Sequence, residues 1–301
     1  MNVRSCNFPH SPKVAVMSKN TYDPKRRNFF KAAGCTLAAS ALTPTNLIAR
    51  QPTADHLQVW SCGGLAEAFM PANKRYEEIT GTRIAYTGAF AAALGKSLQG
   101  SAQTEVFAGR VLKLAQKLRS SGKMEYFKPL CFTRYVIVTP KGNPANISSL
   151  EDLAQKGVRV ALAPEASTPG GAAVLKLLEI AKLKDQVLSN TTIKSSCVQK
   201  MIKHVIDGDG DASIVENRIT RLQIAKDQLE IIEIPESVMP PPPLTFTIGV
   251  MKAAHNRKAA DEYLDFILSP EGQSFFKQAG FIPATSEKGK FLTKKLGVKD
   301  V

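Results

Sequence analysis

The pattern of apolar and polar positions first predicts a strand at residues 57–60. The run that follows has apolar side chains at helical spacing and ends at Gly81, a residue type that commonly terminates helices. The apolar positions of this helix are Leu65, Ala68, Phe69, Ala72, Tyr76 and Ile79. A second strand is predicted at residues 82–86 and a second helix at residues 91–98.

The same order of strand and helix recurs along the chain. A short strand at residues 104–107 precedes a helix at 111–120, and a β-branched run predicts a strand at 134–139. Further strands are predicted at 158–162, 191–193, 212–215 and 246–250, and further helices begin at 149, 172, 198 and 259. Strands that alternate with helices are typical of parallel α/β sheets. The pattern therefore predicts one α/β unit near residues 57–130 and another near 145–235.

The composition is that of a soluble folded protein. Of the 301 residues, 44% are hydrophobic and 22% are charged, which excludes a disordered chain, a collagen-like repeat and a small disulfide-dense domain. The length suggests two domains or one large domain. The sequence contains no run of roughly eighteen apolar residues, so a protein with several membrane-spanning helices is excluded.

The formal charge of +14 is unevenly distributed. Residues 1–41 contain seven basic residues and one acidic residue, and so hold +6 of the total. The other Lys and Arg residues are scattered and form no run interleaved with aromatic residues, so nucleic acid is not favoured as a partner. A small anion remains a natural partner for such a chain.

The first fifty residues resemble a twin-arginine export signal. Arg26-Arg27 is followed by a short apolar run at residues 32–42, and Ala39-Ser40-Ala41 offers a cleavage site. The alternative is a solvated basic tail before a short helix, and Met17 is an alternative start of translation. We expect residues 1–50 to be a signal peptide and leader that the twin-arginine machinery exports, so that the protein works in the periplasm.

Several motifs, in order along the exported chain, resemble those of the molybdate-binding proteins of ABC importers. They are Leu57-Gln58-Val59-Trp60-Ser61-Cys62-Gly63-Gly64-Leu65, Phe69…Tyr76-Glu77…Thr80-Gly81, Arg134-Tyr135-Val136-Ile137-Val138-Thr139-Pro140-Lys141-Gly142, Gly208-Asp209-Gly210-Asp211-Ala212-Ser213-Ile214-Val215 and Phe266-Ile267-Leu268-Ser269-Pro270-Glu271-Gly272-Gln273…Phe276…Gly280-Phe281. The last motif is widespread among periplasmic solute-binding proteins. No single motif is specific to the family; the resemblance rests on the order of the motifs along the chain.

The resemblance implies an α/β, type II periplasmic-binding-protein fold. It has two lobes, each a mostly parallel sheet flanked by helices, with two crossing strands as a hinge. The expected boundaries are 51–132 for the first part of lobe 1, 133–240 for lobe 2 with the hinge strands, and 241–301 for the return to lobe 1 and the C-terminal helices. The implied function is capture of a small anion, such as a molybdate-like oxyanion, for uptake by an ABC permease, without catalysis or a cofactor.

The expected anion site lies where strands turn into helices. The unpaired amides of a helix N-terminus attract anions, and small residues let the backbone approach them closely. Glycine also simply marks loops, but four such turns occur inside the family pattern, at Gly63-Gly64, Gly88-Ala89, Ala108-Gly109 and Gly170-Gly171. The predicted ligand-binding residues are Cys62, Gly63, Gly64, Gly88, Ala89, Gly109, Arg110, Gly170, Gly171, Cys197, Val198 and Glu216.

The site departs from the pattern of the family that it resembles. The Ser hydroxyls usual in the first two turns are missing, and Glu216 stands where a Tyr is usual. A carboxylate repels an anion unless it is protonated or paired with arginine. Arg110 and Arg218 are candidates for that pairing, or for contact with the ligand itself. An organic acid or another solute is therefore an alternative ligand.

Cysteines provide two further hypotheses. Cys62 and Cys197 both precede predicted helices, so with Glu216 they could hold a soft metal or a thiophilic ligand. Alternatively, Cys62 could be an enzyme nucleophile whose pKa is lowered by the helix start. Buried cysteines acting as small hydrophobic residues are the simpler interpretation. The sequence contains no metal-binding motif, and no pattern that pairs Cys62 with a histidine.

Overall fold

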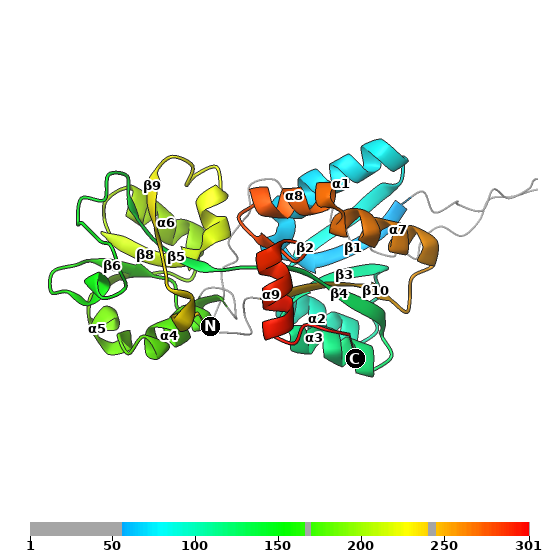
Figure 1. The fold of residues 1–301 in the computed structure, drawn as a ribbon, viewed down its shortest axis with the longest axis horizontal. Helices are drawn as coiled ribbons and strands as arrows, with labels where there is room; N and C mark the ends of the chain where they lie inside the picture. Colours follow the sequence, from blue (N-terminus) through cyan, green and yellow to red (C-terminus); the bar gives the residue numbers. More distant parts are fainter. Residues whose placement is uncertain (1–55, 166–169, 240–244, 301) are drawn as a thin grey trace, which may run out of the picture. The chain divides into compact units, whose positions relative to one another are not determined.

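Two β-sheets, each with helices on both faces, form the architecture (Figure 1). The computed structural model describes residues 56–165, 170–239 and 245–300, which lie in the compact unit 54–301. The predicted leader lies outside the described residues. Within the described residues, no helix is long and apolar enough to span a membrane.

The first sheet has six strands in the order β11-β4-β10-β3-β1-β2. β1 pairs in parallel with both β2 and β3, whereas β10, β4 and β11 add in antiparallel orientation. The strands are β1 His56–Cys62, β2 Arg83–Ala89, β3 Val106–Arg110, β4 Met124–Phe132, β10 Thr245–Met251 and β11 Ile282–Pro283.

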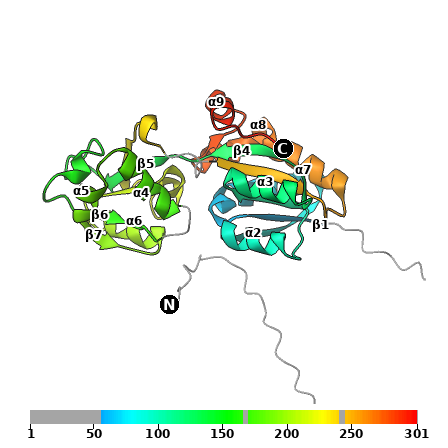
Figure 2. The same ribbon diagram turned by 90° about the horizontal axis from the view of Figure 1, so that it is seen from below.

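Helices cover both faces of the first sheet. A buried cluster joins α1, α7 and α8 to one face, and a second cluster joins α2 and α3 to the other (Figure 2). Trp60 of β1 packs beside the second cluster, and its indole nitrogen is buried without a hydrogen-bond partner in the described part of the chain. The helices are α1 Ala66–Thr80, α2 Ala91–Gln99, α3 Leu112–Ser120, α7 Arg257–Leu268, α8 Pro270–Gln278 and α9 Glu287–Lys295.

The second sheet has five strands in the order β7-β6-β8-β5-β9. β6 pairs in parallel with β7 and β8, and β5 pairs antiparallel with β8 and β9. One face packs against α4 and α5, and the other against α6. The elements are β5 Tyr135–Pro140, β6 Val160–Leu162, β7 Thr191–Lys194, β8 Ala212–Glu216, β9 Leu229–Glu233, α4 Gly170–Ile180, α5 Lys184–Ser189 and α6 Val198–Ile206.

The chain changes sheet at two places. Residues 133–134 join β4 of the first sheet to β5 of the second, and the chain between β9 and β10 returns to the first sheet. β5 and β10 join their sheets in antiparallel orientation, but the strands on either side of each of them share one direction, so each sheet is mostly parallel. The two-sheet α/β architecture itself is confirmed. The proposed hinge and lobe boundaries remain predictions.

Two predicted turns are wrong in their position. Gly88 and Ala89 continue β2, because they pair with Ser61 and Cys62 of β1. Gly109 continues β3, where a Cβ atom would lie 2.7 Å from the Phe107 ring. Glycine in a strand often marks such a close approach, so these glycines were mistaken for turns.

A short 3-10 turn takes the place of one predicted helix. Residues 149–153 do not start an α-helix: the Asp152 carboxylate accepts from the amides of Ser148 and Ser149, and a single turn follows. The 3-10 turns within the described residues are η1 Gly63–Leu65, η2 Asp152–Ala154, η3 Asn217–Arg221 and η4 Glu236–Val238.

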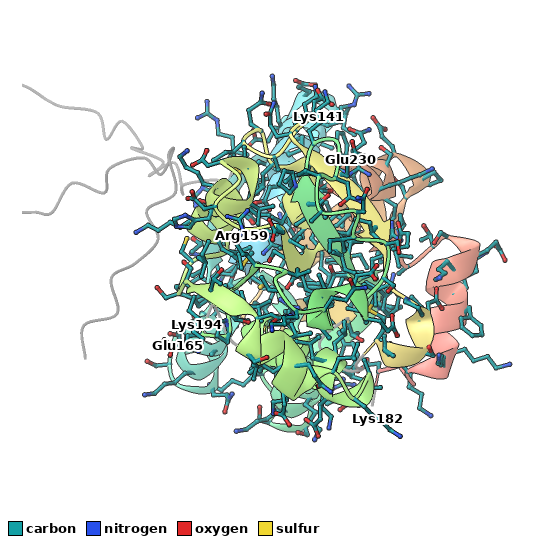
Figure 3. All side chains as sticks on the ribbon, turned by 90° about the vertical axis from the view of Figure 1, so that its left-hand side faces the viewer. Lys141, Arg159, Glu165, Lys182, Lys194 and Glu230 are labelled. Atoms are coloured by element: carbon teal, nitrogen blue, oxygen red, sulfur yellow. The ribbon has the colours of Figure 1, made fainter. Side chains whose placement is uncertain are left out.

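Charged side chains on the second sheet's elements point outward in mixed sign (Figure 3). The exposed residues labelled there are Lys141, Arg159, Glu165, Lys182, Lys194 and Glu230. Basic and acidic groups are interspersed, and the Arg159 guanidinium pairs with Asp211 at 2.6 Å. This face therefore carries charges of both signs.

Candidate functional site

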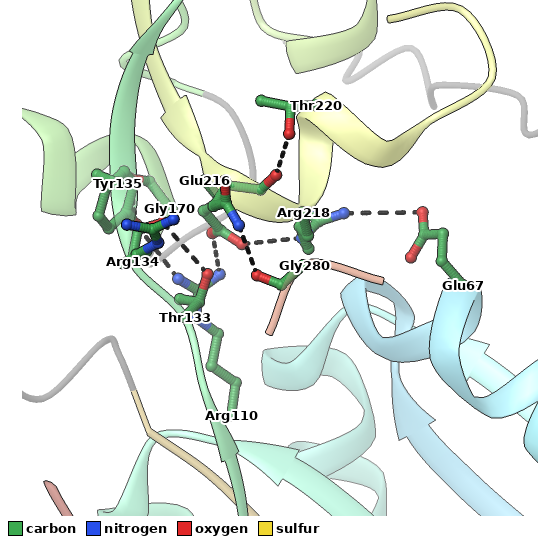
Figure 4. Close-up of polar contacts among 11 residues, drawn as sticks. Glu67, Arg110, Thr133, Arg134, Tyr135, Gly170, Glu216, Arg218, Thr220 and Gly280 are labelled. Carbon is green, nitrogen blue, oxygen red and sulfur yellow. Dashed lines mark hydrogen bonds and ion pairs between the residues drawn. The ribbon is translucent and has the colours of Figure 1, made fainter. Parts of the chain in front are cut away.

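A buried carboxylate and two arginines meet where strands of the two sheets end (Figure 4). Arg110 is the last residue of β3, and Glu216 is the last residue of β8. Arg218 follows Glu216 in the turn η3. Nη1 of Arg110 lies 2.6 Å from one carboxylate oxygen of Glu216, and Nε of Arg218 lies 2.8 Å from the other.

Burial strengthens the electrostatic interactions between the charged groups of this cluster. The side chains of Arg110, Glu216 and Arg218 are only 5%, 7% and 15% exposed. Burial by itself would raise the pKa of Glu216, but the charges of Arg110 and Arg218 outweigh it and hold that pKa at about 2. Glu216 is therefore ionised at neutral pH. Burial would lower the pKa of each arginine, but the Glu216 charge keeps both raised.

The turn η1 supplies the backbone beside Arg218. A Cβ atom on Gly64 would lie 3.2 Å from the Cζ atom of the Arg218 guanidinium, so that group passes directly over the glycine. Arg218 also faces Glu67 of α1, with Nη1 3.7 Å from a carboxylate oxygen. Glycine at position 64 thus permits the observed placement of Arg218.

A second group of hydrogen bonds connects Arg110 with the start of α4. The Tyr135 hydroxyl accepts a hydrogen bond from Nη2 of Arg110 at 3.3 Å, and donates to the Gly170 carbonyl at 3.4 Å. A cavity of about 30 Å³ adjoins these residues, with room for about two water molecules. Its lining includes Tyr135, Gly170, Gly171, Val198, Glu216 and Arg218.

Two helices begin at this small cavity. α4 starts at Gly170 and α6 starts at Val198. The first-turn amides of a helix are unpaired within the helix, and the helix dipole favours negative charge there. A Cβ atom on Gly171 would lie 2.2 Å from the Pro164 carbonyl oxygen, so this glycine allows α4 to begin against the backbone that follows β6.

The structure therefore brings together half of the predicted residues, in two groups. Arg110 contacts Glu216 directly, Arg218 connects Glu216 with Gly64, and Gly170, Gly171 and Val198 line the adjoining cavity. Gly88 instead packs against Gly63, with its Cβ position 3.7 Å from the Gly63 Cα, and thereby supports the turn η1.

Three contributing residues were not among the predicted ligand-binding residues. Arg218 was considered as a partner for Glu216 or as a contact of the ligand itself, whereas Tyr135 and Glu67 were not considered as site residues. Tyr135 begins a β-branched run that is typical of a core strand, and Glu67 lies in the first turn of an amphipathic helix. Neither position carries a local signal of a site, because their partners are distant in sequence.

The residue after Arg110 is held in an unusual backbone conformation. Val111 has φ 75° and ψ 111°, which is strained for a β-branched residue. Its amide donates to the Thr245 carbonyl at 3.1 Å. Strain of this kind persists where the surrounding structure enforces it, and it often lies at binding sites.

The metal and thiol hypotheses gain no support. No group of three or more His, Cys, Asp or Glu residues suited to a metal ion occurs among the described residues. The expected lowering of the Cys62 pKa is wrong: burial raises that pKa by more than the Gly64 amide, Arg110 and Arg218 lower it. Cys62 and Cys131 are buried thiols, and Cys197 is disulfide-bonded.

A larger cavity lies away from the predicted residues. It measures about 420 Å³, and its lining includes Ile234, Ile282, Leu292 and Lys295. None of the predicted ligand-binding residues lines it. The candidate site is therefore chosen for its paired charges and helix starts, and not for the size of its cavity.

Two helix-covered α/β sheets, between which the chain passes at residues 133–134, have the architecture of a type II periplasmic binding protein. The chain belongs to the family of bacterial extracellular solute-binding proteins, whose model matches residues 57–282. The resemblance seen in the sequence motifs is thereby confirmed at the level of the family.

Individual relatives are distant. A protein of Haemophilus influenzae is 22% identical over 244 residues, which cover 81% of this chain and 98% of that protein. The sulfate-binding protein of Escherichia coli is 27% identical over 173 residues, 52% of each chain. The periplasmic molybdate-binding protein of Azotobacter vinelandii shares the fold, with a TM-score of 0.62 and 17% identity over 75% of this chain and 98% of that one.

Proposed function

We propose that this protein captures a small oxyanion or organic anion at the Arg110, Arg218 and Glu216 cluster and delivers it to an ABC permease. The observation that supports this most directly is the convergence of two guanidinium groups, from Arg110 at the end of β3 and Arg218 in η3, both with little exposure. Guanidinium groups bind oxyanions through paired hydrogen bonds. The starts of α4 and α6 beside the cluster add unpaired amides.

The ligand class follows from what the site offers. Sulfate and molybdate are the ligands named for two of its relatives. In this chain the hydroxyls expected in the first two turns are replaced by Cys62, Gly63 and Gly64, and by Gly88 and Ala89. Guanidinium groups and backbone amides would then take over the role of donors.

We further propose that the protein is exported and that it catalyses no reaction. Residues 1–50 would direct the chain through the twin-arginine machinery to the periplasm, where the permease lies in the adjacent inner membrane. A buried thiol with a raised pKa makes a poor nucleophile. Accordingly, Cys62→Ala should retain anion binding, and no product should form from any bound solute.

Thermal unfolding of the purified protein in the presence of a panel of anions tests this function. The panel contains phosphate, sulfate, molybdate, thiosulfate and small organic acids, with zinc and copper salts as the competing class. A ligand at 100 times its Kd should stabilise the protein by about 2.7 kcal/mol. Arg110→Gln should abolish the shift. Stabilisation only by the metal salts, or an unchanged shift in Arg110→Gln, would contradict the proposal.

A further inference from the structure

Glu216 places a negative charge inside a site proposed for anions. Its carboxylate is buried between Arg110 and Arg218, and each of its oxygens faces one guanidinium group. Glu67 adds a second carboxylate on the far side of Arg218. Two arginines and two carboxylates have a formal charge of zero together, so net positive charge does not account for ligand selection.

An ionised carboxylate can only accept hydrogen bonds, and its two oxygens together offer about four acceptor positions. One contact to each oxygen is made by an arginine, so further positions can accept from a ligand. Glu216 and Arg218 line the 30 Å³ cavity where α4 and α6 begin. A tetrahedral anion that enters there has to part the walls of this cavity, and it then meets the carboxylate directly.

We propose, on the basis of the function proposed above, that Glu216 makes this site selective for oxyanions that carry a proton on the bound group. Inorganic phosphate and arsenate keep at least one hydroxyl at neutral pH and can donate it to Glu216. Sulfate, selenate and molybdate have no such proton and place lone pairs against the carboxylate. The ligand of this chain would therefore differ in class from those named for its sulfate- and molybdate-binding relatives.

The expected difference in affinity between protonated and unprotonated oxyanions is large. A buried polar group that loses its hydrogen-bond partner rejects a ligand far more strongly than a small change in apolar shape does. Repulsion between the carboxylate and an unprotonated anion adds to that loss. We expect phosphate to bind at least about 100-fold more tightly than sulfate, which corresponds to about 2.7 kcal/mol.

Isothermal titration of the purified full-length protein at neutral pH tests the inference. The matched pairs are phosphate with sulfate, and arsenate with selenate; each pair shares tetrahedral geometry and differs in the proton. Glu216→Gln replaces an acceptor with a group that also donates, so sulfate and selenate should gain affinity and the preference should fall by at least about tenfold. Glu262→Gln, an exposed carboxylate on α7, removes the same charge elsewhere and should keep the wild-type preference.

The outcomes separate the two proposals. Equal or tighter binding of sulfate and selenate by the wild type would overturn the proton selectivity and leave anion capture intact. Failure of every anion to bind would overturn both. An unchanged preference in a folded Glu216→Gln variant would show that another group selects the ligand. If that variant does not fold, the two wild-type pairs still decide the question.

Discussion

At the scale of single residues, Gly64 and Arg218 form the contact that holds one side of the site. The guanidinium lies over the glycine, and a Cβ atom would approach its Cζ to 3.2 Å. Gly64→Val should push Arg218 away from Glu216 and weaken anion binding about tenfold or more, which corresponds to about 1.4 kcal/mol. Isothermal titration with the tightest anion of the panel measures this change.

A double-mutant cycle provides the control for Gly64→Val. If the valine acts through Arg218, the same substitution in an Arg218→Ala background should change affinity very little. An equal loss in both backgrounds would show that Gly64 matters for its own backbone contacts and that Arg218 does not transmit the effect.

Glu216 should also contribute a pH-dependent part of the folding free energy. Its pKa of about 2 in the folded protein lies below its ordinary value, roughly 4.3. The contribution is therefore complete above the ordinary pKa and is lost as the pH falls towards 2. Urea unfolding should show the free-energy difference between wild type and Glu216→Gln shrinking by roughly 1.5 kcal/mol between pH 5 and pH 3.

Other carboxylates titrate in the same range, so only the difference between the two proteins is informative. Glu262→Gln, which removes an exposed carboxylate on α7, is the control for the loss of a negative charge elsewhere. Parallel pH curves for wild type and Glu216→Gln would mean that the carboxylate is not held between charged arginines.

The sequence identified Arg110, Glu216 and Gly64 as candidates because the family pattern placed them after strands. It did not include Tyr135 or Glu67, because their roles depend on contacts with residues far along the chain. It also left open whether Glu216 repels the ligand or is paired. The geometry shows pairing with both arginines, which strand and helix periodicity cannot specify.

At the scale of elements, the start of α4 depends on Gly171. Replacing a helix-interior glycine with alanine usually gains up to about 1 kcal/mol. Here the added Cβ would lie 2.2 Å from the Pro164 carbonyl oxygen, so Gly171→Ala should instead cost about 1–3 kcal/mol. Differential scanning calorimetry should show a fall in Tm of about 5 °C.

The neighbouring Ala172 is exposed, and Ala172→Ser should stay within about 0.5 kcal/mol of wild type. If Gly171→Ala stabilised the protein, the close approach of α4 to the chain after β6 would be incorrect. The proposed anion site would then lose one of its two helix starts.

Element positions followed well from periodicity where an amphipathic pattern was strong. α6 begins at Val198 as predicted, and α1 ends before Gly81, whose φ of 74° explains the termination. Gly88 and Gly109 were placed in turns although they lie in strands. Their strand pairing is a long-range property, and local turn propensity does not report it.

At the scale of the whole molecule, the structure does not test the predicted export, because the export signal lies outside the described residues. Arg26→Lys together with Arg27→Lys should trap the precursor in the cytoplasm. Immunoblots of periplasmic and cytoplasmic fractions measure this. The conservative change Arg50→Lys, which leaves the pair intact, should not affect export, and normal periplasmic delivery of the double variant would exclude the twin-arginine route.

The pattern of apolar and polar residues did not predict the order of the strands in each sheet. The family resemblance indicated two α/β units, but the antiparallel insertion of β10 between β3 and β4 joins segments more than a hundred residues apart. That insertion places Thr245 next to the strained Val111, directly after Arg110. The geometry of the site therefore depends on a strand that joins the first sheet only after the chain has passed through the second sheet.

Trp60 is the one tryptophan in the sequence, and it lies on β1 two residues before Cys62. Its indole nitrogen is buried without a partner among the described residues. Excitation of tryptophan in this protein therefore reports on one place in the fold, the strand that leads into η1. Intrinsic fluorescence can accordingly follow movement of that strand end during titration with any anion, without a label and at low protein concentration.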